Sequence, residues 1–205
     1  MTTRVLLLLT VASIAFGAAH AEPLSGPGLV RALQRGGYVV MMRHASSPIQ
    51  PPRAEDADPA NAARERQLDS AGREAAVAMG RAIKALHIPV GEVWTSPTFR
   101  ARQTVSLAGL PTPTSLAQLG DGGQSMAGAN SDQAAWLKAK AAEPPRSGTD
   151  TMVVTHLPNL TAAFGEEAAG LPDGAALVFH PVAGRPPEFM GRIRIEEWPQ
   201  LAGGG

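Results

Sequence analysis

The sequence contains no cysteine, few aromatic residues and no cluster of charges of one sign. Without cysteine the chain can form no disulfide, no thiolate nucleophile, no cysteine-ligated metal site and no lipid-modified cysteine. Lys plus Arg equal Asp plus Glu at 18 each, and no basic run occurs, so we expect neither a nucleic-acid-binding surface nor a basic membrane-surface helix. Apolar residues still make up 44% of the 205 residues, which is enough for one folded domain.

The first 21 residues have the pattern of an export signal. Arg4 supplies a positive charge, residues 5–16 are almost wholly apolar, and a small-x-small sequence ends at Ala21, just before Glu22. The apolar stretch is short for a bilayer-spanning helix, which argues against a stable membrane anchor. We therefore expect cleavage near Ala21, a single domain over residues 22–205, and a mature protein that is periplasmic or secreted.

Short apolar runs alternate along the chain with helical patterns, which predicts a mostly parallel sheet covered on both faces, with one antiparallel strand late in the chain. Residues 48–66 have no periodicity and are rich in Pro, Asp, Arg and Ala, so we expect a long surface loop. Strands are expected near residues 38–42, 93–94, 114–117, 151–155, 175–179 and 192–195. Helices are expected near residues 24–37, 68–88 with Asp69 as N-cap, from Ser96-Pro97 onward, 131–141 and 159–169.

Two of the expected strands end in histidine: one leads into Arg43-His44 and the other into His156. The carboxyl ends of parallel strands meet at one edge of a sheet, where ligands bind, so we expect both histidines at that edge. Arg100 is expected in the first turns of the helix after Pro97, whose amino terminus favours an anion at the same edge.

Two arginines, two histidines and a helix terminus at one edge predict a site for a phosphoryl dianion, because the planar arginine fork matches phosphate. With no cysteine and no Gly-x-x-x-x-Gly-Lys loop, the candidate nucleophile is an imidazole. Taken singly, each residue also fits a structural role, since polar residues at strand ends and solvent-facing helical arginines are common. A metal hydrolase is disfavoured, because no His/Asp/Glu ligand pair stands at helical spacing.

Four segments together resemble the motifs of the histidine phosphatase superfamily, also called phosphoglycerate-mutase-like. "MMRHASSP" is similar to its Arg-His-Gly signature, and "RQLDSAGREAA" to its Arg-x-Leu-Thr-x-x-Gly helix start. "VWTSPTFRARQT" resembles its Ser-Ser-Pro-x-x-Arg-Ala-x-x-Thr segment, and "VVTHLPNL" its Val-x-His-x-Pro-Asn segment. The four occur in the family's order and cover about residues 38–160.

The resemblance implies an α/β fold, a three-layer α/β/α sandwich with a mostly parallel central sheet. It also implies that His44 is the phosphorylated nucleophile, that Arg43, Arg100 and His156 form the phosphate pocket, and that no cofactor or metal is needed. The branch it resembles most comprises small bacterial phosphatases, among them phosphohistidine phosphatases and an exported type acting on lipopolysaccharide-core heptose phosphate.

The chain departs from the family pattern in three places. Ala45 replaces the glycine after the histidine. The polar residue that often contacts phosphate a few positions later has three candidates: Ser46, Ser47 and Gln50. The glutamate that mutases carry in a long insertion has no clear equivalent, which argues against mutase activity.

The general acid is the least determined role. Asp121 in "LGDGGQS" is the candidate, because it lies about as far beyond Arg100 as the family's acidic residue often does; a plain turn aspartate is the alternative. Glu55, Asp56 and Asp58 in the long loop are rivals for the same role.

Together these features predict a phosphomonoester hydrolase that works through a phosphohistidine on His44, outside the cytoplasm. Its expected partner is a phosphorylated small molecule or an envelope glycolipid, with no nucleic acid, and the sequence carries no signal for oligomeric state. The alternative is a non-catalytic exported protein that binds phosphate or a phospholigand in the same pocket.

Overall fold

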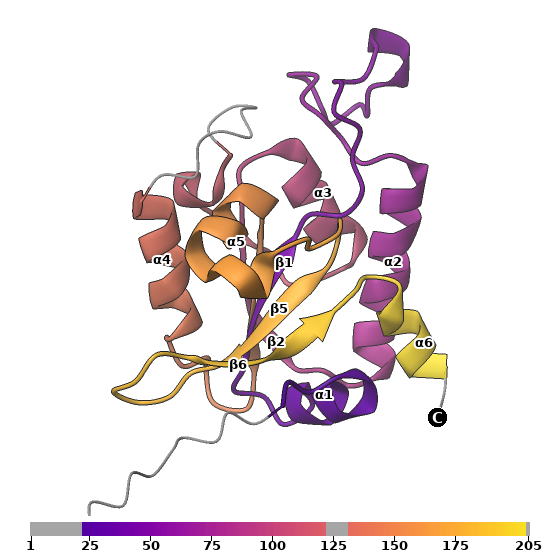
Figure 1. Cartoon of the computed structure of the whole chain (residues 1–205). Helices are drawn as coiled ribbons and strands as arrows, with labels where there is room; N and C mark the ends of the chain where they lie inside the picture. The colour runs from indigo at the N-terminus through magenta and orange to yellow at the C-terminus, as the bar shows by residue number, and fades with distance from the viewer. Residues whose placement is uncertain (1–21, 122–130, 204–205) are drawn as a thin grey trace, which may run out of the picture.

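The computed structural model describes residues 22–121 and 131–203 and forms a six-stranded sheet in the order β3-β2-β4-β1-β5-β6, flanked by helices (Figure 1). The expected export signal lies outside the described residues. The strands are β1 (Val39–Arg43), β2 (Val90–Thr95), β3 (Thr114–Ser115), β4 (Asp150–Thr155), β5 (Ala176–His180) and β6 (Glu188–Ile193). The helices are α1 (Gly26–Leu33), α2 (Ser70–Ala85), α3 (Phe99–Leu107), α4 (Ser131–Ala141), α5 (Leu157–Phe164) and α6 (Glu197–Gly203), with short 3-10 turns η1 (Ala54–Asp56), η2 (Ala117–Leu119) and η3 (Gly165–Ala168).

The sheet is mostly parallel, as predicted. β1 pairs in parallel with β4, and β2 pairs in parallel with both β4 and β3. β5 runs antiparallel to its neighbours β1 and β6, so among the described strands it alone opposes the others. β1 and β4 are central and buried, which explains why both appear in the sequence as continuous apolar runs.

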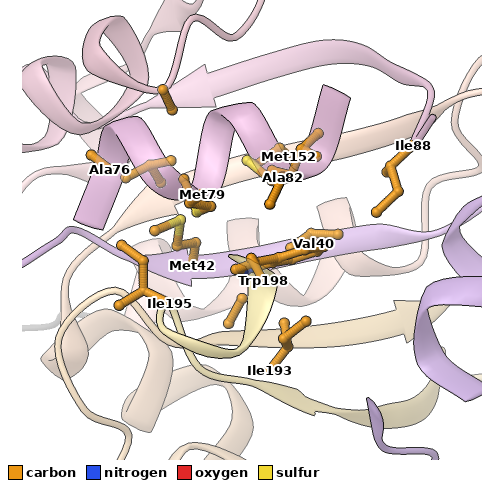
Figure 2. Close-up of a cluster of buried hydrophobic side chains, with 14 of the residues drawn as sticks. Val40, Met42, Ala76, Met79, Ala82, Ile88, Met152, Ile193, Ile195 and Trp198 are labelled. Carbon is orange, nitrogen blue, oxygen red and sulfur yellow. The ribbon is translucent and has the colours of Figure 1, made fainter. Parts of the chain in front are cut away.

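Helices cover both faces of the sheet, which confirms the three-layer sandwich (Figure 1). On one face α1, α2, α3 and α6 bury a core that includes Val40, Met42, Met79 and Trp198 (Figure 2). On the other face α4 and α5 pack on side chains that alternate with these along β1, beginning with Val39. None of the helices in the described part of the chain is both long and apolar enough to cross a membrane.

The start of α2 is anchored to the chain just after β1. Asp69 is the N-cap as predicted, and its side chain accepts a hydrogen bond from the Gly72 N–H at 2.7 Å. Gly72 lies so close to the backbone of Ser46 that a Cβ at this position would overlap the Ser46 carbonyl oxygen. The glycine in the "RQLDSAG" segment is therefore required by this close approach.

Two local predictions were wrong. Helix α3 begins at Phe99 with Thr98 as N-cap, rather than at Pro97 after a Ser96 cap, because the backbone of Thr98 is still extended, with ψ 144°. The last strand spans 188–193 rather than 192–195, and helix α6 follows it. This edge strand is half exposed and α6 has only 7 residues, so neither carries a strong periodic pattern.

Candidate active site

The pairing of β1 with β4 brings His44 and His156 together, as predicted. Arg43 stands opposite Thr155 in the parallel register, and the His44 N–H donates to the Thr155 carbonyl at 3.0 Å. The two imidazole rings lie edge to face with their centroids 5.2 Å apart. Both residues are buried, with 4% of His44 and 2% of His156 exposed. The histidines therefore share one recessed site at the carboxyl edge of the sheet.

Arg100 bridges the two rings from the first turn of α3. Its Nε donates to His44 Nε2 at 3.2 Å, and its Nη2 lies 3.2 Å from His156 Nδ1. The same Nη2 forms an ion pair with Asp121. Arg100 is itself only 4% exposed, so its charge acts at short range on both imidazoles with little screening by water.

These contacts settle the proton on His44. A guanidinium can only donate, so His44 Nε2 must accept and carry a lone pair. His44 Nδ1 lies 2.7 Å from the Ala45 carbonyl and therefore holds the ring proton. The pKa of His44 is lowered well below its usual value, first by burial and then by the neighbouring His156, Arg100 and Arg43, with the Ala45 carbonyl opposing. His44 is thus a neutral imidazole with its Nε2 lone pair on the Arg100 side.

His156 is also held neutral. Burial is the largest cause and the Arg100 charge the second, and together they lower the pKa of His156 to about 3 although Asp121 opposes them. Its Nδ1 faces Arg100, and its Nε2 lies 2.8 Å from the hydroxyl of Ser96. Ser96 had been predicted only as a helix cap, so its contact with His156 was missed.

Arg43 is held by the segment that precedes β5, and one of its three guanidinium nitrogens has no hydrogen-bond partner among the described residues. Its Nη1 donates to the Leu171 carbonyl at 2.9 Å, and its Nη2 lies 2.6 Å from Asp173 Oδ1. Its Nε is buried and has no hydrogen-bond partner among the described residues. Leaving a buried donor of a charged group unpaired is costly, so this Nε is an unsatisfied donor on the residue next to His44.

Arg66 adds a third arginine that sequence reasoning did not assign to the site. Its Nε donates to the Pro48 carbonyl at 2.7 Å and its Nη2 to the Ser47 carbonyl at 3.2 Å, which pins the base of the long loop. The pKa of Arg66 is lowered by partial burial and then by the charge of Arg100, while Asp121 opposes. A sequence signal for Arg66 was present, because Arg66 is the first residue of the "RQLDSAG" segment that resembles a family motif.

Of the four acidic candidates, the structure places Asp121 at the histidines. Its side chain is 11% exposed, and its Oδ2 lies 3.9 Å from His156 Nδ1. Glu55 and Asp56 instead pair with an exposed arginine of the same loop. The Asp58 carboxylate accepts from the Gln103 side chain at 3.1 Å. Asp121 is therefore more than a surface turn residue, although its role as an acid stays a prediction.

The candidates for an additional phosphate contact have other partners. Ser46 donates to Asp69 at 2.7 Å, and Ser47 donates to the Gln67 carbonyl at 2.8 Å. Gln50 is exposed on the loop. In the parts of the chain that the structure describes, no group of three or more His, Asp or Glu side chains is placed to hold a metal ion.

Comparisons with known proteins agree with this architecture. No family model matches the chain, and no curated protein matches it in sequence. Among solved structures, the protein histidine phosphatase SixA complexed with tungstate is 20% identical, with 77% of this chain and 97% of that chain covered and a TM-score of 0.57. A putative phosphohistidine phosphatase SixA from Nakamurella multipartitia is 21% identical, with 77% and 95% covered and a TM-score of 0.54.

A mutant phosphoserine phosphatase from Entamoeba histolytica, in complex with phosphoserine, is 12% identical, with 78% of this chain and 98% of that chain covered and a TM-score of 0.53. At these identities the likeness concerns the fold, and it extends over nearly the whole length of each of these proteins. The chain therefore shares its three-layer α/β/α fold with these three proteins, and the fold class expected from the sequence is confirmed.

Proposed function

We propose that the protein is a phosphatase that hydrolyses phosphomonoesters through a phosphohistidine on His44. One observation carries the proposal: His44 is a buried neutral imidazole whose Nδ1–H is held by the Ala45 carbonyl and whose Nε2 lone pair faces Arg100. A nucleophilic nitrogen beside a guanidinium is what attack on a phosphoryl dianion requires. The names of the similar structures, which include phosphohistidine and phosphoserine phosphatases, support it.

In the first step His44 Nε2 attacks phosphorus, an N–P bond forms, and the bond to the leaving-group oxygen breaks while that oxygen takes a proton from Asp121. In the second step water gives a proton back to Asp121 and attacks phosphorus, the N–P bond breaks with its electron pair returning to Nε2, and phosphate leaves with His44 again neutral. Throughout, the Nδ1–H keeps its bond to the Ala45 carbonyl, so the ring does not need to turn between steps.

The arginines supply the charge that stabilises the transferring group. The unpartnered Nε of Arg43 can donate to a phosphoryl oxygen, and Arg100 can turn its donors from the imidazole nitrogens to the same group. Arg66 adds a third positive charge at the edge of the site. We propose that these charges take the part that a metal ion plays in other phosphatases.

The leaving group decides how much acid catalysis is needed. Asp121 is paired with Arg100 as a carboxylate, and that form has no proton to donate. When Arg100 turns to a phosphoryl group, Asp121 is released to take up and deliver a proton. The ion pair also favours a second candidate substrate, a phosphohistidine side chain, because imidazole is a better leaving group than an alkoxide and needs less help from an acid.

The test uses a chain that begins at Glu22 and three substrates: p-nitrophenyl phosphate, an alkyl phosphate and a phosphohistidine peptide. We expect phosphate release that survives EDTA, and acid-labile, base-stable label on the quenched enzyme. His44→Ala should carry no label, while His87→Asn, a change at an exposed residue with φ 54° at the end of α2, should behave as the parent.

Phosphate binding without release from any substrate would instead identify the non-catalytic binding protein. Activity lost in EDTA and restored by a divalent metal would refute the metal-free mechanism. The proposed export is tested separately, by asking whether the full-length chain expressed in a Gram-negative host is recovered from the periplasm in a form that begins near Glu22.

A further inference from the structure

Ser96 has a fully buried hydroxyl, at 0% exposure, in the turn between β2 and α3. Its Oγ lies 2.8 Å from His156 Nε2. The same oxygen accepts from the Thr98 N–H at 3.2 Å and donates to Thr98 Oγ1 at 3.1 Å. Ser96 is therefore packed against the far side of the His156 ring, opposite the nitrogen that faces Arg100.

The donor and the acceptor of each hydrogen bond between Arg100, His156 and Ser96 follow from the charge of Arg100. Because a guanidinium only donates, His156 Nδ1 must accept, and the ring proton of neutral His156 is then on Nε2. The Nε2–H must donate to Ser96 Oγ. Ser96 Oγ then accepts from the His156 Nε2–H and from the Thr98 N–H and donates to Thr98 Oγ1, which uses its full capacity. Only this placement of the protons satisfies the hydrogen bonds of all four residues, Arg100 included.

We infer that Ser96 is a positioning residue, which fixes the tautomer and the orientation of His156 so that Nδ1 faces Arg100 and the phosphoryl site. The kinetic part of this inference rests on the proposed function. To donate to a phosphoryl oxygen, His156 must hold protons on both nitrogens. A bound phosphoryl group offsets the charge of Arg100 that lowers the pKa of His156, so the monoanionic form of the substrate can pass its proton to Nδ1 and become the dianion. Ser96 accepts the Nε2–H in both states, so His156 gains and loses that proton without turning.

Without the Ser96 hydroxyl, the Nε2–H would be buried with no good acceptor. Thr98 Oγ1 lies 3.5 Å from Nε2, at the limit of a hydrogen bond. The ring is then free to move its proton to Nδ1, which sets an N–H against the donors of Arg100, or to turn over, which puts a C–H in place of the Nδ1 acceptor. Because Arg100 also contacts His44, the disturbance reaches the nucleophile.

The experiment reads the His156 tautomer directly. In the mature chain labelled with ¹⁵N, we expect His156 to show a protonated Nε2 and an unprotonated Nδ1 across neutral pH. Ser96→Ala should change this pattern and lower kcat about 10–100-fold, by analogy with the loss of a partner that orients a metal-bound histidine. Ser96→Cys keeps a small side chain with a weak acceptor, so its kcat should lie between those of the parent and Ser96→Ala. The cysteine variant serves as the test if the alanine variant does not fold.

Ser106→Ala, at an exposed position on α3, is the matched control. It removes a serine hydroxyl from the helix that carries Arg100 and leaves the contacts among Ser96, Thr98 and His156 in place. This variant should keep the His156 tautomer and stay within a few-fold of the parent kcat.

The outcomes separate this inference from the proposed function. A proton on Nδ1 of His156 in the parent would overturn the inference whether or not the protein is active. An unchanged tautomer or an unchanged kcat in an active Ser96→Ala variant would also overturn it, and the proposed function would stand. If the tautomer shifts as expected but the parent releases no phosphate, the proposed function fails while the positioning contact remains.

Discussion

Replacing Asp150 with asparagine should change how the stability of the fold depends on pH. Asp150 begins β4 and is 1% exposed, and its Oδ1 accepts a hydrogen bond from the Tyr38 N–H at 2.9 Å. Its Oδ2 is buried without a hydrogen-bond partner among the described residues. Burial raises the pKa of this carboxyl to about 7, with the Tyr38 N–H opposing. Its ionised form therefore weakens the native state.

The size of the effect follows from the two pKa values. Raising the pKa from 3.8 to about 7 corresponds to about 4 kcal/mol at alkaline pH. Because the native pKa is the higher one, the native state holds more protons between these values, and the free energy of unfolding falls as pH rises from about 4 to about 7.

Asparagine does not titrate and keeps an acceptor for Tyr38. Its unpaired amide N–H groups cost about 1–3 kcal/mol at every pH. We therefore expect Asp150→Asn to be more stable than the parent by about 1–3 kcal/mol near pH 8, and this advantage to fall by about 3 kcal/mol on going to about pH 4.5.

Urea unfolding followed by tryptophan fluorescence measures the free energy of unfolding at each pH. Trp198 is 1% exposed in the core, so its fluorescence changes when the core unfolds. Asp132→Asn, at an exposed position on α4, is the control and should run parallel to the parent across pH. If the difference between Asp150→Asn and the parent does not change with pH, the carboxyl is not desolvated in the native state and the reasoning from burial fails.

Substitutions at three further positions test the site and its support. Both Arg100→Lys and Arg100→Ala should lower kcat about 10²–10³-fold, because an ammonium cannot bridge two imidazoles; near-parent kinetics would remove Arg100 from the site. Asp121→Asn should slow alkyl phosphates about 10²–10⁴-fold and spare p-nitrophenyl phosphate, and equal slowing of both would show that Asp121 only anchors Arg100. Gly72→Ala should reduce the free energy of unfolding by about 1–3 kcal/mol through overlap with the Ser46 carbonyl, whereas Gly203→Ala, which meets open space, should not; equal denaturation midpoints would contradict the overlap.

The central strands β1 and β4 and the position of their histidines were predictable, because two general rules of parallel sheets apply to them. A strand buried on both faces must be apolar throughout, and parallel strands end at the same edge, so the runs leading to His44 and His156 predicted both the pairing and the meeting of the rings. Arg100 was predicted there too, although its helix begins two residues later than expected.

The contacts between side chains could not be predicted in the same way. That Arg100 bridges both imidazoles, and that Ser96 accepts from His156 rather than capping a helix, depends on how β2 and α3 lie against β4. Arg66 shows a different limit, because its segment was recognised but nothing in the spacing places its side chain near Arg100. The edge strand β6 and the short helix α6 lack a clear period, so tertiary packing decides them.

The strand order also bears on how the protein acquires its activity. β1 lies between β4 and β5, and both of these partners come from late in the chain, so the strand that delivers His44 is completed only after most of the sequence is available. Pairings between such distant segments form slowly, because the intervening chain must first be ordered. During refolding, helical signal should therefore return before catalytic turnover does. The return of turnover would then report that β1 has paired with both β4 and β5. The sequence has no cysteine, so no disulfide can hold a partly folded state together before that.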